Sequence, residues 1–147
     1  MTVDITTEIV IDRLVDAVAR VAADPTNAPK WYENIESVSW KTEPPPQIGS
    51  LVTFVAKFLG RRLEYTYEIV ELDDHHLVMR TAEGPFPMET TYTFTPVSPT
   101  STRMTLRNRG EPSGFSKVAA PLMVTAMRRA NQKDLAKLKA LVESERP

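Results

Sequence analysis

Two tyrosines stand two residues apart in the stretch LEYTYEI, residues 63–69, where apolar and polar residues alternate strictly. This period of two is typical of a strand with one buried face, and it places Tyr65 and Tyr67 on that face. A buried tyrosine needs a partner for its hydroxyl, or it offers that hydroxyl to a ligand. In an apolar cavity such a hydroxyl, like that of Tyr92, could orient an enolate or bind the polar end of a small molecule.

Three further polar side chains, Thr81, Thr90 and Asn108, fall on otherwise apolar strand faces. A buried polar group without a partner costs about 1–3 kcal/mol. These groups therefore bond to one another or to water, or they bind the polar end of a ligand. For Asn108, which lies near a strand end, exposure to solvent is a third interpretation.

The sequence offers few groups for other chemistry. The only histidines, His75 and His76, are adjacent in a predicted turn, and this spacing does not make a metal site. There is no GxSxG motif and no phosphate-binding glycine loop, and the absence of cysteine excludes thiolate catalysis. The acidic residues Glu64, Glu68 and Glu89 point outward by alternation. We assign no catalytic residue, expect no metal site, and leave open whether the protein is an enzyme.

The composition is that of one globular domain. The chain has 147 residues, of which 41% are hydrophobic and 25% charged, so we predict a single domain over residues 1–147. A formal net charge of −1 argues against nucleic acid as a partner. The N-terminus lacks a basic n-region, and no stretch approaches the ~20 apolar residues of a membrane span. We expect a cytoplasmic protein without integral membrane association.

The charge is unevenly distributed. Residues 100–139 hold nine basic and two acidic residues, whereas residues 1–99 hold 15 acidic and 8 basic ones. The basic segment is either a patch for an anionic ligand or a membrane surface, or the ordinary solvated face of a strand and a helix.

Periodicity and turn signals predict one strand, a helix, a second short helix, six more strands and a long helix. The predicted strands are 3–11, 35–42, 50–59, 62–72, 76–82, 88–97 and 102–110, and the helices lie at 13–23, within 24–35 and at 111–145. We expect Asp12 to cap the first helix and Thr26 or Asn27 the second. Gly60-Arg61 is the predicted hairpin turn, and Pro121 should kink the long helix or mark a fresh start.

Six consecutive strands joined by short turns predict an antiparallel meander in an α+β protein. The amphipathic C-terminal helix is the only element long enough to cover the apolar face of such a sheet. A strongly curved sheet around a long helix would leave space between the two.

The chain resembles the START-like (SRPBCC) superfamily, and within it the polyketide cyclase/dehydrase and lipid transport group. The matching stretches run nearly end to end, and they are DRLVDAVARVAADPTNAPKW, PPPQIGS, FLGRRLEYTYEIVEL, RTAEGPFPMETTYTF, RMTLRNRGEP and RRANQKDLAKLKALVE. The resemblance implies a helix-grip fold, in which a curved antiparallel seven-stranded sheet wraps around a long C-terminal helix, with two short helices after strand one. It also implies a deep cavity for an apolar or aromatic small molecule, without a metal or redox cofactor.

In that fold, one side of each strand and one face of the helix would line the cavity. A cavity no larger than ~300 Å³ beneath the helix would argue against binding of a hydrophobic small molecule. The residues so placed are mostly aromatic or apolar and rich in methionine, with a few polar groups, as in ligand pockets. They are Phe54, Phe58, Tyr65, Tyr67, Met79, Thr81, Met88, Thr90, Tyr92, Phe94, Met104, Leu106, Asn108, Leu122, Met123 and Met127. The alternative is that they pack a solid core. Trp31 is either one wall of the cavity mouth or a packing anchor.

Three functions remain open at this point. The first is binding of a hydrophobic small molecule that is lipid-like, polyketide or aromatic. The second is the reaction of a polyketide aromatase/cyclase, and the third is a protein-interaction or stress-response role like that of the chaperone activators. The sequence does not specify the oligomeric state, although an exposed edge strand could support a dimer.

Overall fold

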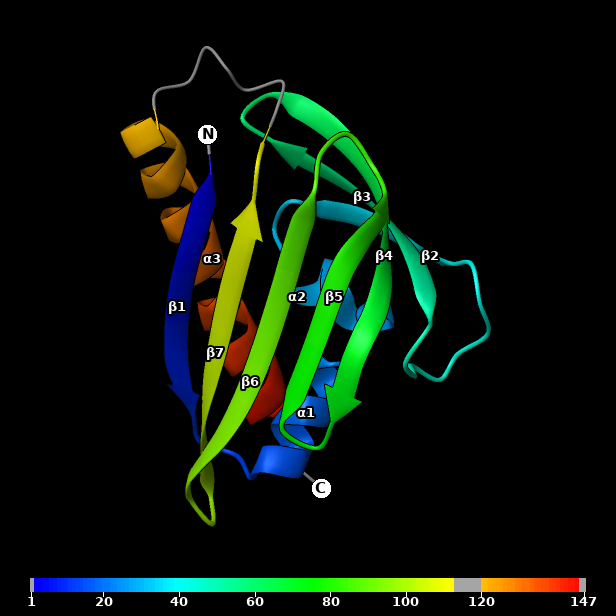
Figure 1. The fold of residues 1–147 in the computed structure, drawn as a ribbon. Helices are drawn as coiled ribbons and strands as arrows, with labels where there is room; N and C mark the ends of the chain where they lie inside the picture. Colours follow the sequence, from blue (N-terminus) through cyan, green and yellow to red (C-terminus); the bar gives the residue numbers. More distant parts are fainter. Residues whose placement is uncertain (1, 113–119, 146–147) are drawn as a thin grey trace.

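The computed structural model describes residues 2–112 and 120–145, which form one curved antiparallel sheet and three α-helices (Figure 1). The strands are β1 (Val3–Ile11), β2 (Ile35–Trp40), β3 (Leu51–Phe58), β4 (Arg61–Asp73), β5 (His76–Glu83), β6 (Met88–Ser98) and β7 (Ser101–Gly110). The helices are α1 (Val15–Ala22), α2 (Ala28–Trp31), which follows a 3₁₀ turn at Pro25–Asn27, and α3 (Ala120–Ser144).

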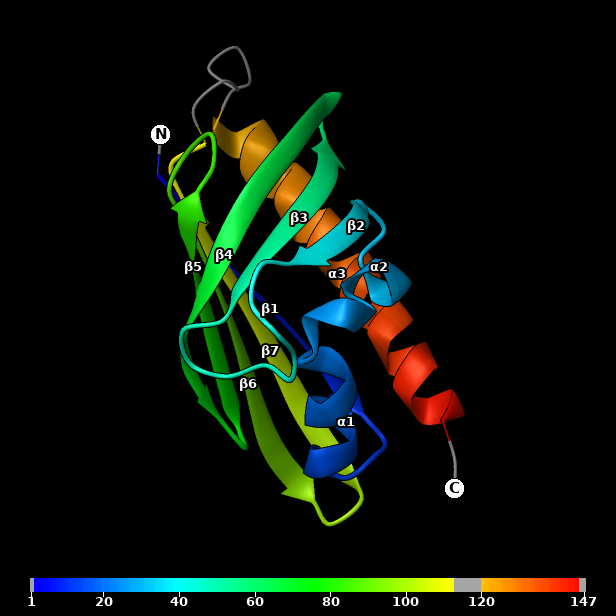
Figure 2. The same cartoon turned by 90° about the vertical axis from the view of Figure 1, so that its right-hand side faces the viewer.

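The seven strands follow the order β1-β7-β6-β5-β4-β3-β2, and every neighbouring pair is antiparallel. The predicted meander of six consecutive strands is therefore confirmed, with β1 added beside β7. Figure 2 shows that the sheet curves around α3 and that α1 and α2 lie on the same concave side. This is the helix-grip arrangement that the resemblance implied.

The β3–β4 hairpin turns at Leu59-Gly60, one residue before the predicted Gly60-Arg61. Phe58 pairs with Arg61 across the turn, so two residues form the loop. Both have positive φ, +49° for Leu59 and +79° for Gly60. Two-residue hairpin loops with this conformation match the right-handed twist of the strands. The turn sets the register that brings Tyr65 opposite Phe54.

The predicted cap of α1 is wrong. Leu14 occupies the N-cap position and no side chain caps the helix. The backbone N–H of Asp12 donates instead to Oε2 of Glu143 at 2.8 Å, which ties the end of β1 to the end of α3. Before α2, it is Asp24 that accepts from the Thr26 N–H at 3.0 Å. Asn27 takes the N-cap position, but its side chain donates to the Val21 carbonyl at 3.2 Å and makes no capping bond.

Helix α3 is described from Ala120 onward, and Pro121 lies in its first turn. The residues immediately before Ala120 lie outside the described part of the chain, so the kink or fresh start at Pro121 stays a prediction. Phe115, within the part of the long helix predicted at 111–145, falls in the segment 113–119 outside the described residues. None of the described helices has the length and apolarity that crossing a membrane requires.

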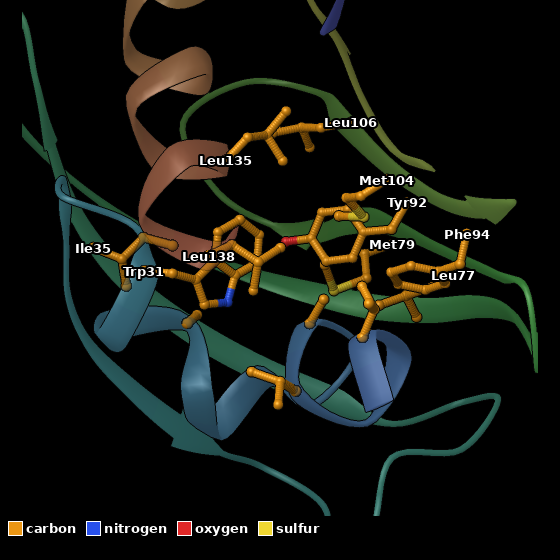
Figure 3. Close-up of a cluster of buried hydrophobic side chains, with 14 of the residues drawn as sticks. Trp31, Ile35, Leu77, Met79, Tyr92, Phe94, Met104, Leu106, Leu135 and Leu138 are labelled. Carbon is orange, nitrogen blue, oxygen red and sulfur yellow. The ribbon is translucent and has the colours of Figure 1, made fainter. Parts of the chain in front are cut away.

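The core is divided into two apolar clusters beneath α3. The larger cluster contains Trp31, which is 0% exposed and packs against Tyr92 with ring centroids 5.6 Å apart. Figure 3 shows Trp31 of α2 beside Leu138 of α3, with the ring of Tyr92 from β6 near both. Its complete burial favours the interpretation of Trp31 as a packing anchor. The second cluster, at the other end of the sheet, gathers Val3, Ile5, Leu63, Phe86 and Met123.

The basic residues of β7 lie beside carboxylates on the outer face of the sheet. Arg107 donates to both oxygens of Asp4, at 2.9 and 2.7 Å. Arg109 pairs with Glu89, and Arg103 lies 3.9 Å from Glu8. Exposed ion pairs of this kind contribute little to stability, because water and salt screen them. This pairing favours an ordinary solvated face over a basic patch at this strand.

Candidate functional site

A cavity of about 160 Å³, open to the surface at one end, lies between the two core clusters and is bounded by the sheet and α3. Most of its lining side chains are apolar or aromatic. The predicted cavity residues that line it are Phe54, Phe58, Tyr65, Tyr67, Met79, Met88, Thr90, Tyr92, Asn108, Met123 and Met127. Lys57 and Arg109, whose side chains are 66% and 45% exposed, line its surface end.

The other five predicted residues do not line the cavity. Phe94, Met104 and Leu106 are at most 1% exposed within the larger apolar cluster, so they pack a solid core. The hydroxyl of Thr81 bonds to the backbone of Met88, accepting from its N–H at 2.9 Å and donating to its carbonyl at 3.1 Å. That cross-strand bond satisfies Thr81 without a ligand.

The prediction for Leu122 is wrong, because its side chain is 65% exposed. An α-helix turns about 100° per residue, so a single step moves a side chain off the inward face. The inward face of α3 runs through Met123, Met127, Asn131 and Asp134, which all line the cavity.

The cavity falls below the ~300 Å³ set for binding of a hydrophobic small molecule, which argues against a large or lipid-like ligand enclosed there, and aromatic rings explain the small volume. The rings of Phe54, Tyr65 and Tyr67 contact one another with centroids 5.0–5.7 Å apart and occupy part of the space under the helix. A cavity of ~150 Å³ in another protein holds one benzene molecule. A ligand enclosed here must therefore be compact, or must extend out of the cavity at its surface end.

A chain of hydrogen bonds crosses the cavity wall from the sheet to α3. The hydroxyl of Tyr67 lies 2.8 Å from Oγ1 of Thr90, which accepts from Nδ2 of Asn108 at 3.0 Å. Oδ1 of Asn108 in turn accepts from Nδ2 of Asn131 at 2.7 Å. Thr90 and Asn108 are thus partnered within the protein. Oδ1 of Asn131 accepts no hydrogen bond from the residues that the structure describes.

A second polar group stands at the junction of α2 and α3. The hydroxyls of Tyr32 and Tyr92 lie 2.6 Å apart. Asp134, 2% exposed, accepts the backbone N–H of Glu33 at Oδ1, at 3.0 Å. Burial raises the pKa of the Asp134 carboxyl to about 6, although the Glu33 hydrogen bond opposes the shift. Burial also raises the pKa of both tyrosines, so they stay protonated at neutral pH.

The hydroxyls of Tyr65 and Tyr67 differ in their partners. Burial raises the pKa of Tyr67 to about 12, with the bond to Thr90 acting in the opposite direction. Burial likewise raises the pKa of Tyr65 well above its usual range, and its hydroxyl forms no hydrogen bond with the described residues. Tyr67 therefore belongs to the wall, whereas Tyr65 can offer its hydroxyl to a bound molecule.

Sequence reasoning missed Tyr32, Asn131 and Asp134. Asn131 and Asp134 follow Met123 and Met127 at helical spacing, so the sequence pattern already places two polar residues on the inward face of α3. Tyr32 gave no such signal, because it follows a four-residue helix whose orientation depends on the tertiary structure. Within residues 2–112 and 120–145, no group of three or more His, Asp or Glu side chains could hold a metal ion.

Comparisons with known proteins agree with this architecture. The family model described as "Polyketide cyclase / dehydrase and lipid transport" matches residues 2–143. No curated protein matches the chain significantly.

Three solved structures illustrate the shared fold. A protein from Thermus thermophilus has 22% identity and a TM-score of 0.82, with 97% of this chain and 98% of that chain covered. A START superfamily protein from Mycobacterium smegmatis has 13% identity and a TM-score of 0.81, covering 96% and 97%. The Zhui aromatase/cyclase from Streptomyces sp. R1128 has 16% identity and a TM-score of 0.79, covering 97% and 94%. At these identities the likeness shows the fold alone.

Proposed function

The chain belongs to the polyketide cyclase/dehydrase and lipid transport family, and from this premise we propose that it binds a compact apolar or aromatic small molecule between the sheet and α3. The observation that carries the proposal is the cavity of about 160 Å³, with its apolar walls and its few convergent polar groups. Ligand pockets combine these two features, since apolar walls supply affinity and a few polar groups fix orientation.

The walls suit a ligand that varies in shape. Met79, Met88, Met123 and Met127 contribute flexible thioether side chains on several sides of the cavity. Methionine adapts to irregular shapes and contacts aromatic rings favourably. The hydroxyl of Tyr65 and the polar residues of α3 would then hold the ligand's polar end.

We expect Ala130→Trp to abolish binding of a neutral aromatic probe, 2-naphthol. Ala130 lines the cavity from α3, so an indole at this position would occupy the ligand's space. The dissociation constant, measured by isothermal titration calorimetry, should rise at least about 100-fold, which corresponds to ~2.8 kcal/mol. Ala136→Trp, at an exposed position on the same helix, is the matched control and should bind like the wild-type protein. Equal affinity in both variants would place the binding site elsewhere.

A second candidate function, cyclisation of a poly-β-keto substrate, is favoured by Asp134 and the hydroxyl pair of Tyr32 and Tyr92. A carboxylate whose pKa is near 6 can remove a proton from the carbon between two carbonyls at neutral pH. The resulting carbanion would attack a second carbonyl of the same chain, and a tyrosine hydroxyl would donate a hydrogen bond to the new alkoxide. Two similar structures are aromatase/cyclases, Zhui and the di-domain protein BexL.

For this candidate, Asp134→Asn should lower the cyclisation rate by about 10²–10⁴-fold, the usual contribution of a general base. Product formation from a synthetic poly-β-ketone would be followed by absorbance, and the wild-type rate should rise with pH around 6. Asp74→Asn, in the turn between β4 and β5, controls for the change in net charge. An unchanged rate in Asp134→Asn would remove the enzymatic candidate and leave the binding function intact.

A further inference from the structure

We infer that the cavity selects a neutral ligand whose buried end donates a hydrogen bond, such as a phenol or another hydroxyl compound, and excludes ligands that end in a carboxylate, sulfonate or phosphate. The inference rests on the proposed binding function and adds the chemical class of the ligand. It follows from the acceptor atoms that α3 leaves unpartnered and from the position of the cavity's cations. The Tyr65 hydroxyl, on the sheet side, can accept from or donate to the same ligand.

The polar atoms that α3 leaves for a ligand are hydrogen-bond acceptors. Asp134 and Asn131 are three residues apart and so share one face of the helix, and they are 2% and 7% exposed. Oδ1 of Asp134 accepts the Glu33 N–H, and Nδ2 of Asn131 donates to Asn108. Oδ2 of Asp134 and Oδ1 of Asn131 have no hydrogen-bond partner among the described residues. Both can only accept, so a ligand satisfies them by donating.

No cation within the described cavity lining is placed to neutralise a buried anion. The basic lining residues are Lys57 and Arg109, both largely exposed, and each already faces a carboxylate, that of Glu36 at 3.3 Å and that of Glu89. An anionic ligand end in the interior would instead lie near Asp134. A buried charge without a partner is strongly disfavoured, and a like charge nearby adds repulsion.

The immediate electrostatic surroundings of Asp134 do not reverse this preference. Glu33 adds negative potential at the Asp134 carboxyl, and Lys137, an exposed residue of α3, adds positive potential from the solvent side. Neither the Tyr32 nor the Tyr92 hydroxyl carries charge at neutral pH, because burial raises the pKa of both. Glu89, the other carboxylate of the described lining, is paired with Arg80 and Arg109, so Asp134 is the carboxylate there without a basic partner.

Three probes with the same naphthalene ring separate the effect of ligand charge from that of hydrogen-bond donation. They are 2-naphthol, which is neutral and donates, 2-methoxynaphthalene, which is neutral and cannot donate, and 2-naphthoate, which is an anion. At pH 7.5, calorimetric titration of the full chain should show 2-naphthol binding about tenfold more tightly than 2-methoxynaphthalene. It should also show 2-naphthoate binding at least about 100-fold more weakly than 2-naphthol.

Asp134→Asn provides the test within the site. The asparagine keeps an acceptor for the Glu33 N–H and removes the charge. The dissociation constant of 2-naphthoate divided by that of 2-naphthol should therefore fall about tenfold. Asp74→Asn makes the same change in net charge away from the cavity and should leave the ratio unchanged.

The outcomes distinguish the two levels of the proposal. Equal binding of 2-naphthoate and 2-naphthol, or a ratio that Asp134→Asn does not alter, overturns the inferred ligand class and leaves the binding function standing. Failure of all three probes to bind overturns the proposed function together with the inference. Three results together support the binding function and the ligand class. They are tighter binding of 2-naphthol than of 2-methoxynaphthalene, much weaker binding of 2-naphthoate, and a smaller difference between 2-naphthoate and 2-naphthol in Asp134→Asn.

Discussion

Replacing Trp31 by alanine is expected to lower the free energy of unfolding by about 3–5 kcal/mol, the usual loss for a fully buried aromatic residue. Trp31 is 0% exposed, and its ring contacts those of Tyr32 and Tyr92. The substitution would open a void between α2, α3 and the sheet, which packed neighbours fill only in part. Urea unfolding followed by circular dichroism measures the loss.

The chain supplies a matched control, its other tryptophan. Trp40 is only partly buried, lies on the edge strand β2, and donates from Nε1 to Thr26 Oγ1 at 2.9 Å. Trp40→Ala should cost clearly less than Trp31→Ala. Trp31→Phe should also cost less, since Nε1 of Trp31 is buried without a hydrogen-bond partner among the described residues and its loss removes no bond there. Similar losses for Trp31→Ala and Trp40→Ala would show that Trp31 does not anchor α2.

Asp134→Asn is expected to raise the free energy of unfolding at pH 7.5 by about 2–3 kcal/mol, because a pKa displaced by one unit corresponds to ~1.4 kcal/mol. The carboxyl titrates near 6 in the folded protein and near its ordinary value of about 3.9 when unfolded. Above pH 6 both states are charged, and only the folded state carries the cost of burying that charge. Between pH 6 and 4 the folded state takes up a proton first, so the wild-type protein gains stability as pH falls.

The stabilisation by Asp134→Asn should therefore be complete above pH 6 and disappear below about pH 4. Urea unfolding of both proteins at pH 7.5 and pH 4 tests this difference. Asp134→Leu separates charge from hydrogen bonding, since leucine leaves the Glu33 N–H without its acceptor. A gain of equal size at both pH values would show that the effect comes from packing and not from the carboxylate.

A residue that lowers stability while lining a cavity points to a role in binding or catalysis. Asp134 fits this description, because asparagine would satisfy Glu33 equally well without a buried charge. Either ligand selection or proton transfer would account for a buried carboxylate at this position. The naphthalene probes and the cyclisation assay distinguish these two uses.

Local periodicity predicted the strands, and in β4 alternation placed Leu63, Tyr67 and Ile69 inward as observed. It worked less well for α3, where a step of one residue separates exposed Leu122 from buried Met123. A helix rich in apolar residues allows several assignments of its inward face, and only packing against the sheet decides among them.

The cavity itself was less predictable than the fold. Its volume depends on how the rings of Phe54, Tyr65 and Tyr67 fill the space, which follows from rotamers and not from alternation. The bonds that join Thr90, Asn108 and Asn131 require both the β6–β7 register and the position of α3. The cytoplasmic location stays a prediction, and the sequence specifies no oligomeric state.

Native mass spectrometry tests most directly whether the cavity is a ligand site. The wild-type protein, Ala130→Trp and Ala136→Trp would each be measured as purified and after incubation with excess 2-naphthol, and released compounds would be identified after denaturation. We predict a one-to-one complex with a neutral compound in the wild-type protein and in Ala136→Trp, and its loss in Ala130→Trp. An apo mass for the wild-type protein under both conditions, or a complex that persists in Ala130→Trp, would contradict the assignment of this cavity.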